Sequence, residues 1–354
     1  MFTYMVALNT NAINFNPKHR GKIIGILNAF FAGSPSVFSA LYFHVIGKDN
    51  PKSVDSFSTL MLVFAVSFVV IDILCIGFLH VFPNEEQLGK IFPDVTEKNS
   101  EASGVQAHNN GFTEDSNTTD AVATSDNTLK YVTDSTNTIV NAEPDDVSMI
   151  KILLNVDYQL LTWVITSASV AGLVFTIALT QTTSAIGLAS HNADIVLIIP
   201  ITNGVISAAV GIISDYFKQR LPRLGIFVAG NFTFVICQCL VVGLADEYPV
   251  LVIATVFNGI GQGILWSIAP TVMSEIFSIK NLGRNWGIAL LVSSLVGFAA
   301  QEAFGALYDA GISVPGEVYC YGMSCVRGGH AVTLGITAMS MVLGVILYIR
   351  RRRG

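Results

Sequence analysis

The sequence predicts an all-α protein that crosses a membrane several times, and three observations point to this class. Of its 354 residues, 52% are hydrophobic and only 12% are charged, whereas soluble domains carry about 25% charged residues. The mean hydropathy is +0.59. Eight runs are long enough to cross the hydrocarbon core as helices, which takes about 20 mainly apolar residues, whereas barrel strands alternate over about ten.

The expected spans are continuous apolar runs separated by short polar turns or by one long polar segment. They cover residues 23–46, 59–82, 160–180, 195–213, 224–244, 249–273, 286–308 and 331–349. Residues 1–15 look like the tail of a further span, too short and too polar to cross alone. Gly25, Ala29 and Gly33 recur every fourth residue along the first full span, a spacing typical of a packing face between membrane helices.

An acidic segment divides the spans into two blocks. Residues 83–150 hold thirteen Asp or Glu against three Lys, with few large apolar residues. Such a composition cannot bury enough apolar surface to offset the chain entropy lost on folding, so we expect residues 83–155 to be a disordered linker. The expected organisation is a partial first bundle over 1–82, this linker, and a second bundle over 156–354 with a basic C-terminal tail.

The basic residues predict the orientation. One set of turns holds twelve cations and the alternating set holds three, and Lys and Arg in short loops stay cytoplasmic. We therefore expect the linker and the C-terminus in the cytosol, with the loops at 245–249 and 309–330 on the other side. The Arg350–Arg353 run would anchor the last helix and contact acidic lipid. Because the Asn-Thr-Thr sequon at Asn117 lies in the linker, a glycan there would contradict this topology.

The stretch GIISDYFKQRLPRLG, residues 211–225, gathers charges between two apolar runs. Its cations suit the cytoplasmic surface, where anionic lipid attracts them. Asp215 lies at the C-terminal end of its helix, where an acid is unfavourable toward the helix dipole. We expect Asp215 either to pair with a neighbouring cation or to cap an adjacent helix. Gly211, one turn earlier on the same face, would let a neighbouring helix approach closely.

This turn resembles the signature loop of the major facilitator superfamily. The residues that carry the resemblance are Gly211, Asp215, Lys218, Arg220 and Arg223. In that superfamily such loops join helices two to three and eight to nine. The resemblance implies that the six spans after the linker are helices seven to twelve, and that residues 1–82 supply the end of helix four and then helices five and six. Helices one to three would be absent from this chain.

Five stretches are similar to the nodulin-like branch of the superfamily. They are the Pro-x-x-Arg-Gly turn at 17–21, VDYQLLTW at 156–163, SDYF at 214–217 with Pro222 and Arg223, GILWSIAPTVMSEIFSIKNLG at 263–283, and Cys-Tyr-Gly-x-x-Cys at 320–325. Their order along most of the chain is specific for the family. It does not indicate a substrate.

Polar groups inside spans are costly and mark candidate functional positions. Asp72 lies near the middle of its span, where an acid costs about 2.5–3.5 kcal/mol, so it should face protein or water rather than lipid. It either fixes packing as a buried acid or couples transport to a proton or contacts substrate. Glu302 lies toward the outer end of its span, where it either contributes to function or snorkels to the interface.

Three residues of one span, Asn258, Gln262 and Trp266, stand one turn apart and share a helix face. A polar and aromatic stripe of this kind suits the wall of a cavity that binds a small polar solute. The alternative is hydrogen bonding between helices, worth about 0.6 kcal/mol on average in a membrane protein. Gln181 and Asn203, on the two preceding helices, are candidates of the same kind.

Other chemistry is not indicated. The glycines at 259, 261 and 263 form no dinucleotide fingerprint, because no βαβ unit surrounds them. The six His are dispersed, so we expect no metal site and no cofactor, and no catalytic constellation or nucleic-acid-binding feature is present in the sequence. Cys320 and Cys325 lie on the expected non-cytoplasmic side, where a short-loop disulfide can form or stay open.

The leading functional hypothesis is a secondary-active transporter that moves a small solute, with or without proton coupling, by rocking of two helix bundles about a midplane site. The 211–223 loop would stabilise one end of the cycle. A second hypothesis is a non-transporting scaffold or receptor-like membrane subunit, and a third is an incomplete gene model of a transporter. Because no Lys or Arg lies well inside a span, a dianionic substrate is disfavoured for this half. The sequence indicates neither the oligomeric state nor which membrane holds the protein.

Overall fold

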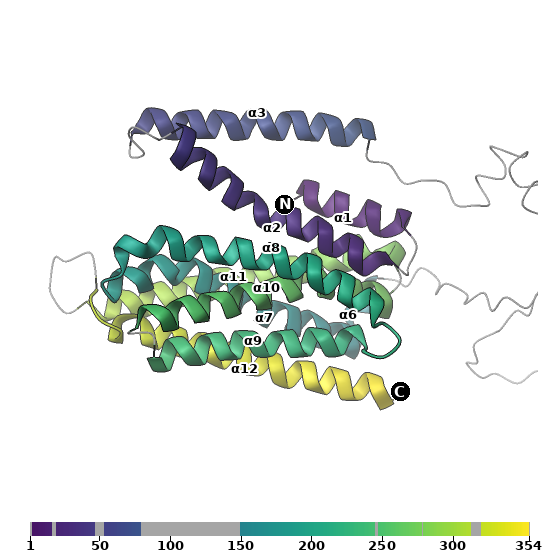
Figure 1. Ribbon diagram of the computed structural model, residues 1–354. Coiled ribbons are helices and arrows are strands. Elements are labelled where there is room, and N and C mark those ends of the chain that lie inside the picture. Colours follow the sequence, from purple (N-terminus) through teal and green to yellow (C-terminus); the bar gives the residue numbers. More distant parts are fainter. Residues whose placement is uncertain are drawn as a thin grey trace, which may run out of the picture. The chain divides into compact units, whose positions relative to one another are not determined.

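The computed structural model describes residues 2–15, 19–46, 53–78, 149–244, 247–277, 279–312 and 320–353. Every regular element within these ranges is a helix (Figure 1). The elements of the first block are α1 (Phe2–Asn14), α2 (Arg20–Leu41), the π-helical turn η2 (Tyr42–Ile46) and α3 (Val54–Phe78). Those of the second are α6 (Met149–Leu153), α7 (Val156–Ala185), η3 (Ala189–His191), α8 (Asn192–Tyr216), α9 (Arg223–Leu244), α10 (Tyr248–Ile276), η4 (Ile279–Asn281), α11 (Leu282–Ala310) and α12 (Ser324–Arg353). The prediction of an all-α protein is confirmed.

Eight of the described helices, α2, α3 and α7 to α12, are long and apolar enough to cross a membrane. They match the eight predicted spans in number and order, and the protein is therefore an integral, multi-pass membrane protein. The 13 residues of α1 fall short of the roughly 20 that a crossing requires, as expected for that segment.

The described helices before and after the predicted linker belong to one compact unit. Residues 81–145 lie outside the described residues, and with them the sequon at Asn117 and nearly all of the predicted linker.

The described end of the predicted linker is helical. Residues 149–153 form α6, and Ile152 is buried. Asn155 then caps α7, because its Oδ1 accepts hydrogen bonds from the backbone N–H groups of Asp157 (2.9 Å) and Tyr158 (3.3 Å). Residues 149–153, which lie inside the predicted disordered linker, are therefore helical, since Ile152 packs into the core of the bundle.

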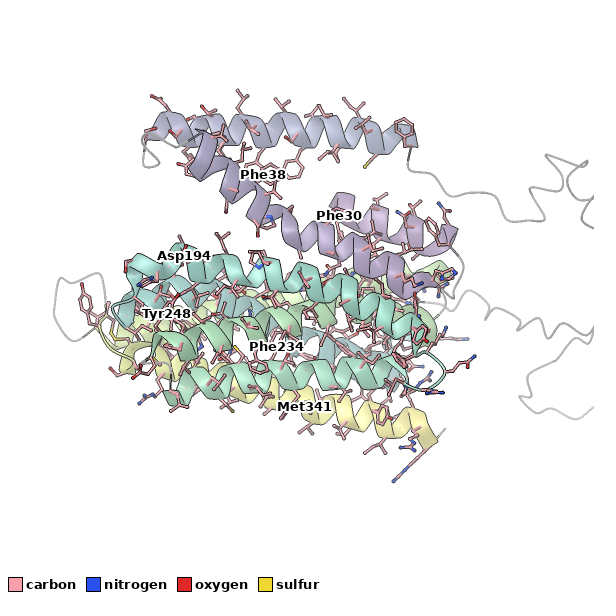
Figure 2. The ribbon with its side chains drawn as sticks, viewed as in Figure 1. Phe30, Phe38, Asp194, Phe234, Tyr248 and Met341 are labelled. Carbon is pink, nitrogen blue, oxygen red and sulfur yellow. A yellow bond between two sulfur atoms is a disulfide. The ribbon has the colours of Figure 1, made fainter. Side chains whose placement is uncertain are left out.

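The centre of the bundle is formed by α7 and α10. In the most apolar 18-residue stretch of each helix, 72% of the residues of α7 and 61% of those of α10 are buried, against 0% for α3. Two helices, α11 and α12, pack against α7. Two others, α8 and α9, pack against α10. The helix α2 lies along α8. At the far end of α2, Phe38 contacts Phe64 of α3, with ring centroids 4.5 Å apart (Figure 2).

Glycines let α10 approach two neighbours closely. A Cβ atom on Gly263 would lie 2.9 Å from the Asn203 carbonyl oxygen on α8, and one on Gly261 would lie 2.8 Å from the ring of Phe234 on α9. Phe234, labelled in Figure 2, is buried at this contact. These glycines therefore serve close helix packing.

The basic turns meet at one end of the bundle, formed by the starts of α2, α7, α9 and α11 and the ends of α8, α10 and α12. We call this the basic end. Asp157 at the start of α7 accepts hydrogen bonds from Arg350 Nε (2.6 Å) and Arg351 Nη1 (3.3 Å) at the end of α12. Figure 1 shows the C-terminus and the α8–α9 turn at this same end. The alternation of basic turns predicted this gathering, whereas the side of the membrane on which it lies stays a prediction.

Candidate functional site: a charge cluster and a polar cavity

The carboxylate of Asp215 caps the N-terminus of α2. Its Oδ1 accepts a hydrogen bond from the backbone N–H of Gly21 (3.1 Å), and its Oδ2 accepts one from the backbone N–H of Lys22 (2.7 Å). The first N–H groups of a helix have no partner within it and carry the positive end of its dipole. An acid that is unfavourable at the end of α8 is therefore stabilised by the start of α2.

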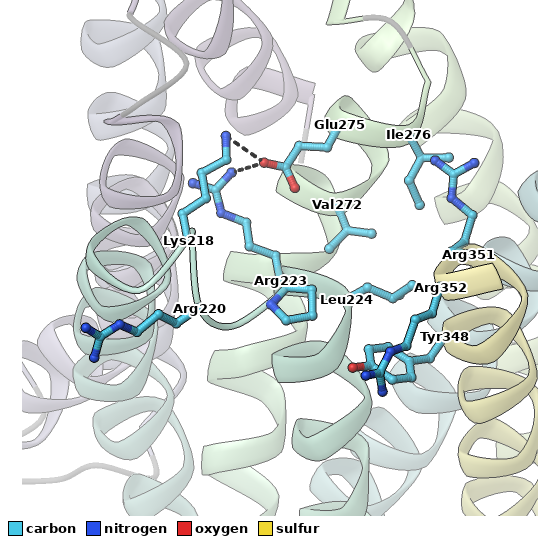
Figure 3. A pocket seen from close by; sticks show the side chains of 11 residues that line it. Lys218, Arg220, Arg223, Leu224, Val272, Glu275, Ile276, Tyr348, Arg351 and Arg352 are labelled. Carbon is cyan, nitrogen blue, oxygen red and sulfur yellow. Dashed lines mark hydrogen bonds and ion pairs between the residues drawn. The ribbon is translucent and has the colours of Figure 1, made fainter. Parts of the chain in front are cut away.

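The same carboxylate belongs to a chain of ion pairs that we call the charge cluster: Asp215, Arg223, Glu275 and Lys218. Arg223, the first residue of α9, donates from Nη2 to Asp215 Oδ1 and from Nη1 to Glu275 Oε1. Lys218 Nζ lies 3.1 Å from the same Glu275 oxygen (Figure 3). Pairing and capping, the two alternatives expected for Asp215, thus occur together.

Burial makes this cluster sensitive to change. Only 3% of the Asp215 side chain and 1% of the Arg223 side chain are exposed. Water screens such a pair little, and removing one partner leaves an uncompensated buried charge, which costs about 3–5 kcal/mol. Glu275 entered the sequence analysis only as a family motif residue. Its pairing with Arg223 depends on the ends of α9 and α10 meeting in space.

A glycine contact lies directly beside the cluster. A Cβ atom on Gly211 would lie 2.5 Å from the Gly21 carbonyl oxygen and 3.0 Å from Gly25 Cα, and one on Gly25 would lie 2.5 Å from the Ser207 carbonyl oxygen. The close helix approach expected at Gly211 is therefore present, with α2 as the neighbour. The small-residue stripe of α2 is only partly used, because a Cβ on Gly33 would meet nothing within 4 Å.

A cavity of about 560 Å³ lies between α1, α2, α7, α8, α10 and α11, and we call it the central cavity. Its polar lining consists of amides and hydroxyls: Tyr4, Asn28, Ser34, Ser39, Ser169, Thr176, Asn203, Gln262, Ser293 and Ser294. None of the described residues that line it is charged. Its α8 lining, from Val196 to Asn203, belongs to the half of that helix farther from the basic end.

Three of the predicted cavity residues, Asn203, Gln262 and Trp266, do line the central cavity. Gln262 Nε2 donates to Thr176 Oγ1 (2.9 Å), which fixes the amide against α7. Trp266 stands edge-on to Trp286 with ring centroids 6.2 Å apart. Asn258 does not line the cavity. It is buried one turn away, and its Nδ2 donates to the same Thr176 oxygen (3.3 Å).

Asn28 is a cavity residue that the sequence analysis did not select. Its Nδ2 donates to Ser207 Oγ (2.6 Å), and its Oδ1 accepts a hydrogen bond from the Tyr4 hydroxyl (3.4 Å). Ser207 in turn donates to Asn203 Oδ1 (3.1 Å). These bonds join α1, α2 and α8 between the central cavity and the charge cluster. A lone amide inside the apolar run GILNAFF carries the same sequence signal as Asp72 and would have identified it.

The structure does not bring Asp72, Glu302 or Gln181 to the central cavity. Asp72 is exposed on α3, a helix with no buried residue, and Glu302 is exposed on α11. Gln181 is half-buried on α7, and its Oε1 has no hydrogen-bond partner among the described residues. The expectation that Asp72 faces protein or water rather than lipid stays a prediction.

A second polar network was also not anticipated, and it centres on His330 of α12. His330 is fully buried, with Nε2 3.0 Å from Thr182 Oγ1 and Nδ1 3.1 Å from Gln238 Oε1. The rings of Phe175 and Phe304 lie on either side, with centroids 5.9 and 5.2 Å away. The network ties α7, α9 and α12 together inside the second block.

We expect His330→Leu to lower the thermal stability of the purified protein. The substitution leaves Gln238 Oε1 buried without a donor, which costs about 1–3 kcal/mol. The double variant His330→Leu with Gln238→Leu should recover part of the loss, because both polar groups are then removed. The apparent Tm of each variant would test this, with His191→Leu, at an exposed position, as control. An unchanged Tm for His330→Leu would refute the assignment.

Cys320 and Cys325 are joined by a disulfide, with Cα atoms 5.9 Å apart. It lies at the start of α12, at the end of the bundle opposite the basic end. No group of three or more His, Cys, Asp or Glu that could hold a metal ion occurs in the described part of the chain.

Comparison with known proteins gives two partial matches. A stretch of 117 residues is 28% identical to "Probable transporter MCH1" of Yarrowia lipolytica, covering 31% of this chain and 24% of that protein. A stretch of 112 residues is 30% identical to "Probable transporter mch1" of Aspergillus fumigatus, covering 29% of this chain and 17% of that protein. The matched region thus spans a quarter or less of each relative's length. No family model matches the chain. The chain is therefore similar, over about a third of its length, to fungal proteins named as probable transporters.

Proposed function

We propose that the protein is a secondary-active transporter that moves a small solute across the membrane. The observation that carries the proposal is the position of the central cavity. It is bounded by helices of both sequence blocks, and α2 and α8 meet beyond it in the charge cluster and glycine contact. The similarity to two probable transporters supports the same conclusion. We assign the chain to the major facilitator superfamily and its nodulin-like branch on the motifs described above, with α7 to α12 as helices seven to twelve.

Transport by alternating access requires contacts that exist in one conformation and break in the other. The candidates are the bonds from Asp215 to Gly21 and Lys22, and those from Asn28 to Ser207. All of them join α2 of the first block to α8 of the second. Rocking of one block against the other would break them together and open the basic end.

The lining of the central cavity favours an uncharged solute that is largely apolar and carries a few hydrogen-bonding groups, because most of the exposed lining is apolar. Amides, hydroxyls and the Trp266 ring supply hydrogen bonds and an apolar face, whereas an ionic solute would require a charged partner. The proposed orientation places the basic end in the cytosol. Tags on residues 83–148 and on the C-terminus should then both be reached only from the cytosolic side.

Uptake by the purified protein in liposomes tests the function. We expect saturable uptake of at least one member of a panel of small solutes, measured with a proton gradient imposed and then collapsed to test proton coupling. Gln262→Leu should raise KM for that solute about two- to tenfold, since a neutral hydrogen bond worth about 0.5–1.5 kcal/mol is lost. Gln181→Leu, which changes a glutamine outside the cavity lining, should leave KM unchanged.

Two results would contradict this proposal. Folded protein that shows no saturable uptake across the panel would favour the scaffold or receptor-like alternative. Equal effects of Gln262→Leu and Gln181→Leu on KM, with the apparent Tm of both variants retained, would place the binding site elsewhere.

A further inference from the structure

A second pocket, of about 500 Å³, lies at the basic end between the α8–α9 turn, the end of α10 and the last turns of α12. Figure 3 shows Lys218 and Arg220 on one side of it and Arg351 and Arg352 on the other. With Arg223, five cations line the pocket against one acid, Glu275, which gives a formal net charge of +4. We call it the basic pocket.

The acidic side chains among the described residues do not neutralise this charge. Glu275 is shared by Lys218 and Arg223, and Arg351 pairs with Asp157. Arg220 and Arg352 have no ion-pair partner among the described residues. Arg223 Nε is buried in the wall of the pocket, and no described residue forms a hydrogen bond with it. Arg220 and Arg352 thus come from opposite sides of the pocket, and in Figure 3 the Arg220 side chain extends away from Arg352.

The remaining lining is apolar and identifies the kind of anion. Leu224, Val272, Ile276 and the ring of Tyr348 lie between the two groups of cations. A free inorganic ion would leave this apolar surface uncovered, whereas a phospholipid brings glycerol and acyl groups with its phosphate. The pocket also lies at the ends of membrane-spanning helices, where lipid headgroups are concentrated and basic pockets between helices bind them. Arginine forks match the oxygens of a phosphate.

We propose that the basic pocket binds the headgroup phosphate of an anionic phospholipid, with Arg352 on one side of the phosphate and, on the other, Arg220, whose side chain turns toward it on binding. The lipid would connect the α8–α9 turn to the end of α12. Because Lys218, Arg223 and Glu275 belong to both the pocket and the charge cluster, bound lipid lies directly beside the contacts that close the basic end. This site is separate from the central cavity and does not depend on what the protein transports.

Native mass spectrometry of the delipidated protein, titrated with phosphatidylglycerol and with phosphatidylcholine, tests the site. We expect phosphatidylglycerol to bind more tightly, and the double variant Arg220→Gln with Arg352→Gln to weaken its first binding step about thirtyfold, as expected for the loss of two cations near a lipid surface. The matched control Arg327→Gln with Arg353→Gln removes the same charge from positions outside the pocket. It should change binding little. Arg220→Lys with Arg352→Lys should restore most of the affinity.

Three results would overturn the proposal. Equal weakening in the two Gln double variants, with apparent Tm retained, would mean general attraction to a basic surface. Equal binding of phosphatidylcholine would mean that the phosphate charge is not recognised. Displacement of phosphatidylglycerol by an equimolar amount of sn-glycerol 3-phosphate would mean that the pocket takes a soluble phosphate and that the acyl chains contribute nothing.

Discussion

Replacing Asp215 with Asn is expected to shift the protein toward a conformation in which the basic end is open. The amide keeps the shape of the side chain but loses the charge that pairs with Arg223 and that two N–H groups of α2 share. Arg223 retains Glu275, so the loss is about 1.5–3 kcal/mol, the contribution of a hydrogen bond to a charged group, rather than the full cost of an unpaired buried charge. At 1.4 kcal/mol per factor of ten, the ratio of closed to open protein should fall about tenfold or more.

Cysteine labelling measures this shift. A cysteine at Ser39, which lines the central cavity on α2, should react more slowly with a membrane-impermeant maleimide in Asp215→Asn than in the parent protein. The control is Asp194→Asn, which makes the same change in the first turn of the same helix, at the opposite end of the bundle. The assigned role of Asp215 is wrong if the labelling rate at Ser39 is unchanged, or if the control alters it equally.

Replacing Gly211 with Ala is expected to destabilise the protein, about as much as the same change at Gly25 on the facing helix. The added methyl group would lie 2.5 Å from the Gly21 carbonyl oxygen and 3.0 Å from Gly25 Cα, and both are backbone atoms that cannot rotate away. The helices must therefore separate, and overpacking of this kind costs about 1–3 kcal/mol. Separation also draws Asp215 away from the N–H groups that it caps.

Gly33→Ala provides the matched control, because the same methyl group on α2 meets nothing within 4 Å. Alanine is the better helix former by about 1 kcal/mol, so this variant should be neutral or slightly more stable. Apparent Tm values of the two variants in one detergent would decide the matter. A Gly211→Ala protein as stable as Gly33→Ala would show that α2 and α8 are not in the close contact described.

The charged turn was largely predictable from sequence. A cation-rich turn after an apolar run is expected at a helix end at the membrane surface, because Lys and Arg are unfavourable inside the hydrocarbon core. An acid at a helix C-terminus needs a positive partner. Those two constraints predicted a capping or pairing role for Asp215, and the missing side chain of Gly211 on the same face predicted a close contact; both are present. They did not identify α2 as the capped helix or Glu275 as the second acid, since both partners come from distant parts of the sequence.

The cavity was predicted less completely. Asn203, Gln262 and Trp266 line it, because a polar stripe on a membrane helix avoids lipid. The same reasoning selected Asp72, Glu302 and Gln181, which lie elsewhere, and passed over Asn28. The free-energy cost of a polar side chain in the hydrocarbon core indicates that the side chain needs a partner, but it does not indicate which helix supplies that partner.

What the sequence determined by itself is the number of crossing helices, their alternation and the end at which the cations gather, because the bilayer constrains each span separately through its length, polarity and flanking charge. What only the tertiary structure decided is which polar groups meet. The bonds of Asn28 with Ser207 and of Arg223 with Glu275 join helices 179 and 52 residues apart in sequence. Such contacts depend on how closely glycines and other small residues let the helices approach, a property of pairs of helices that no single span carries.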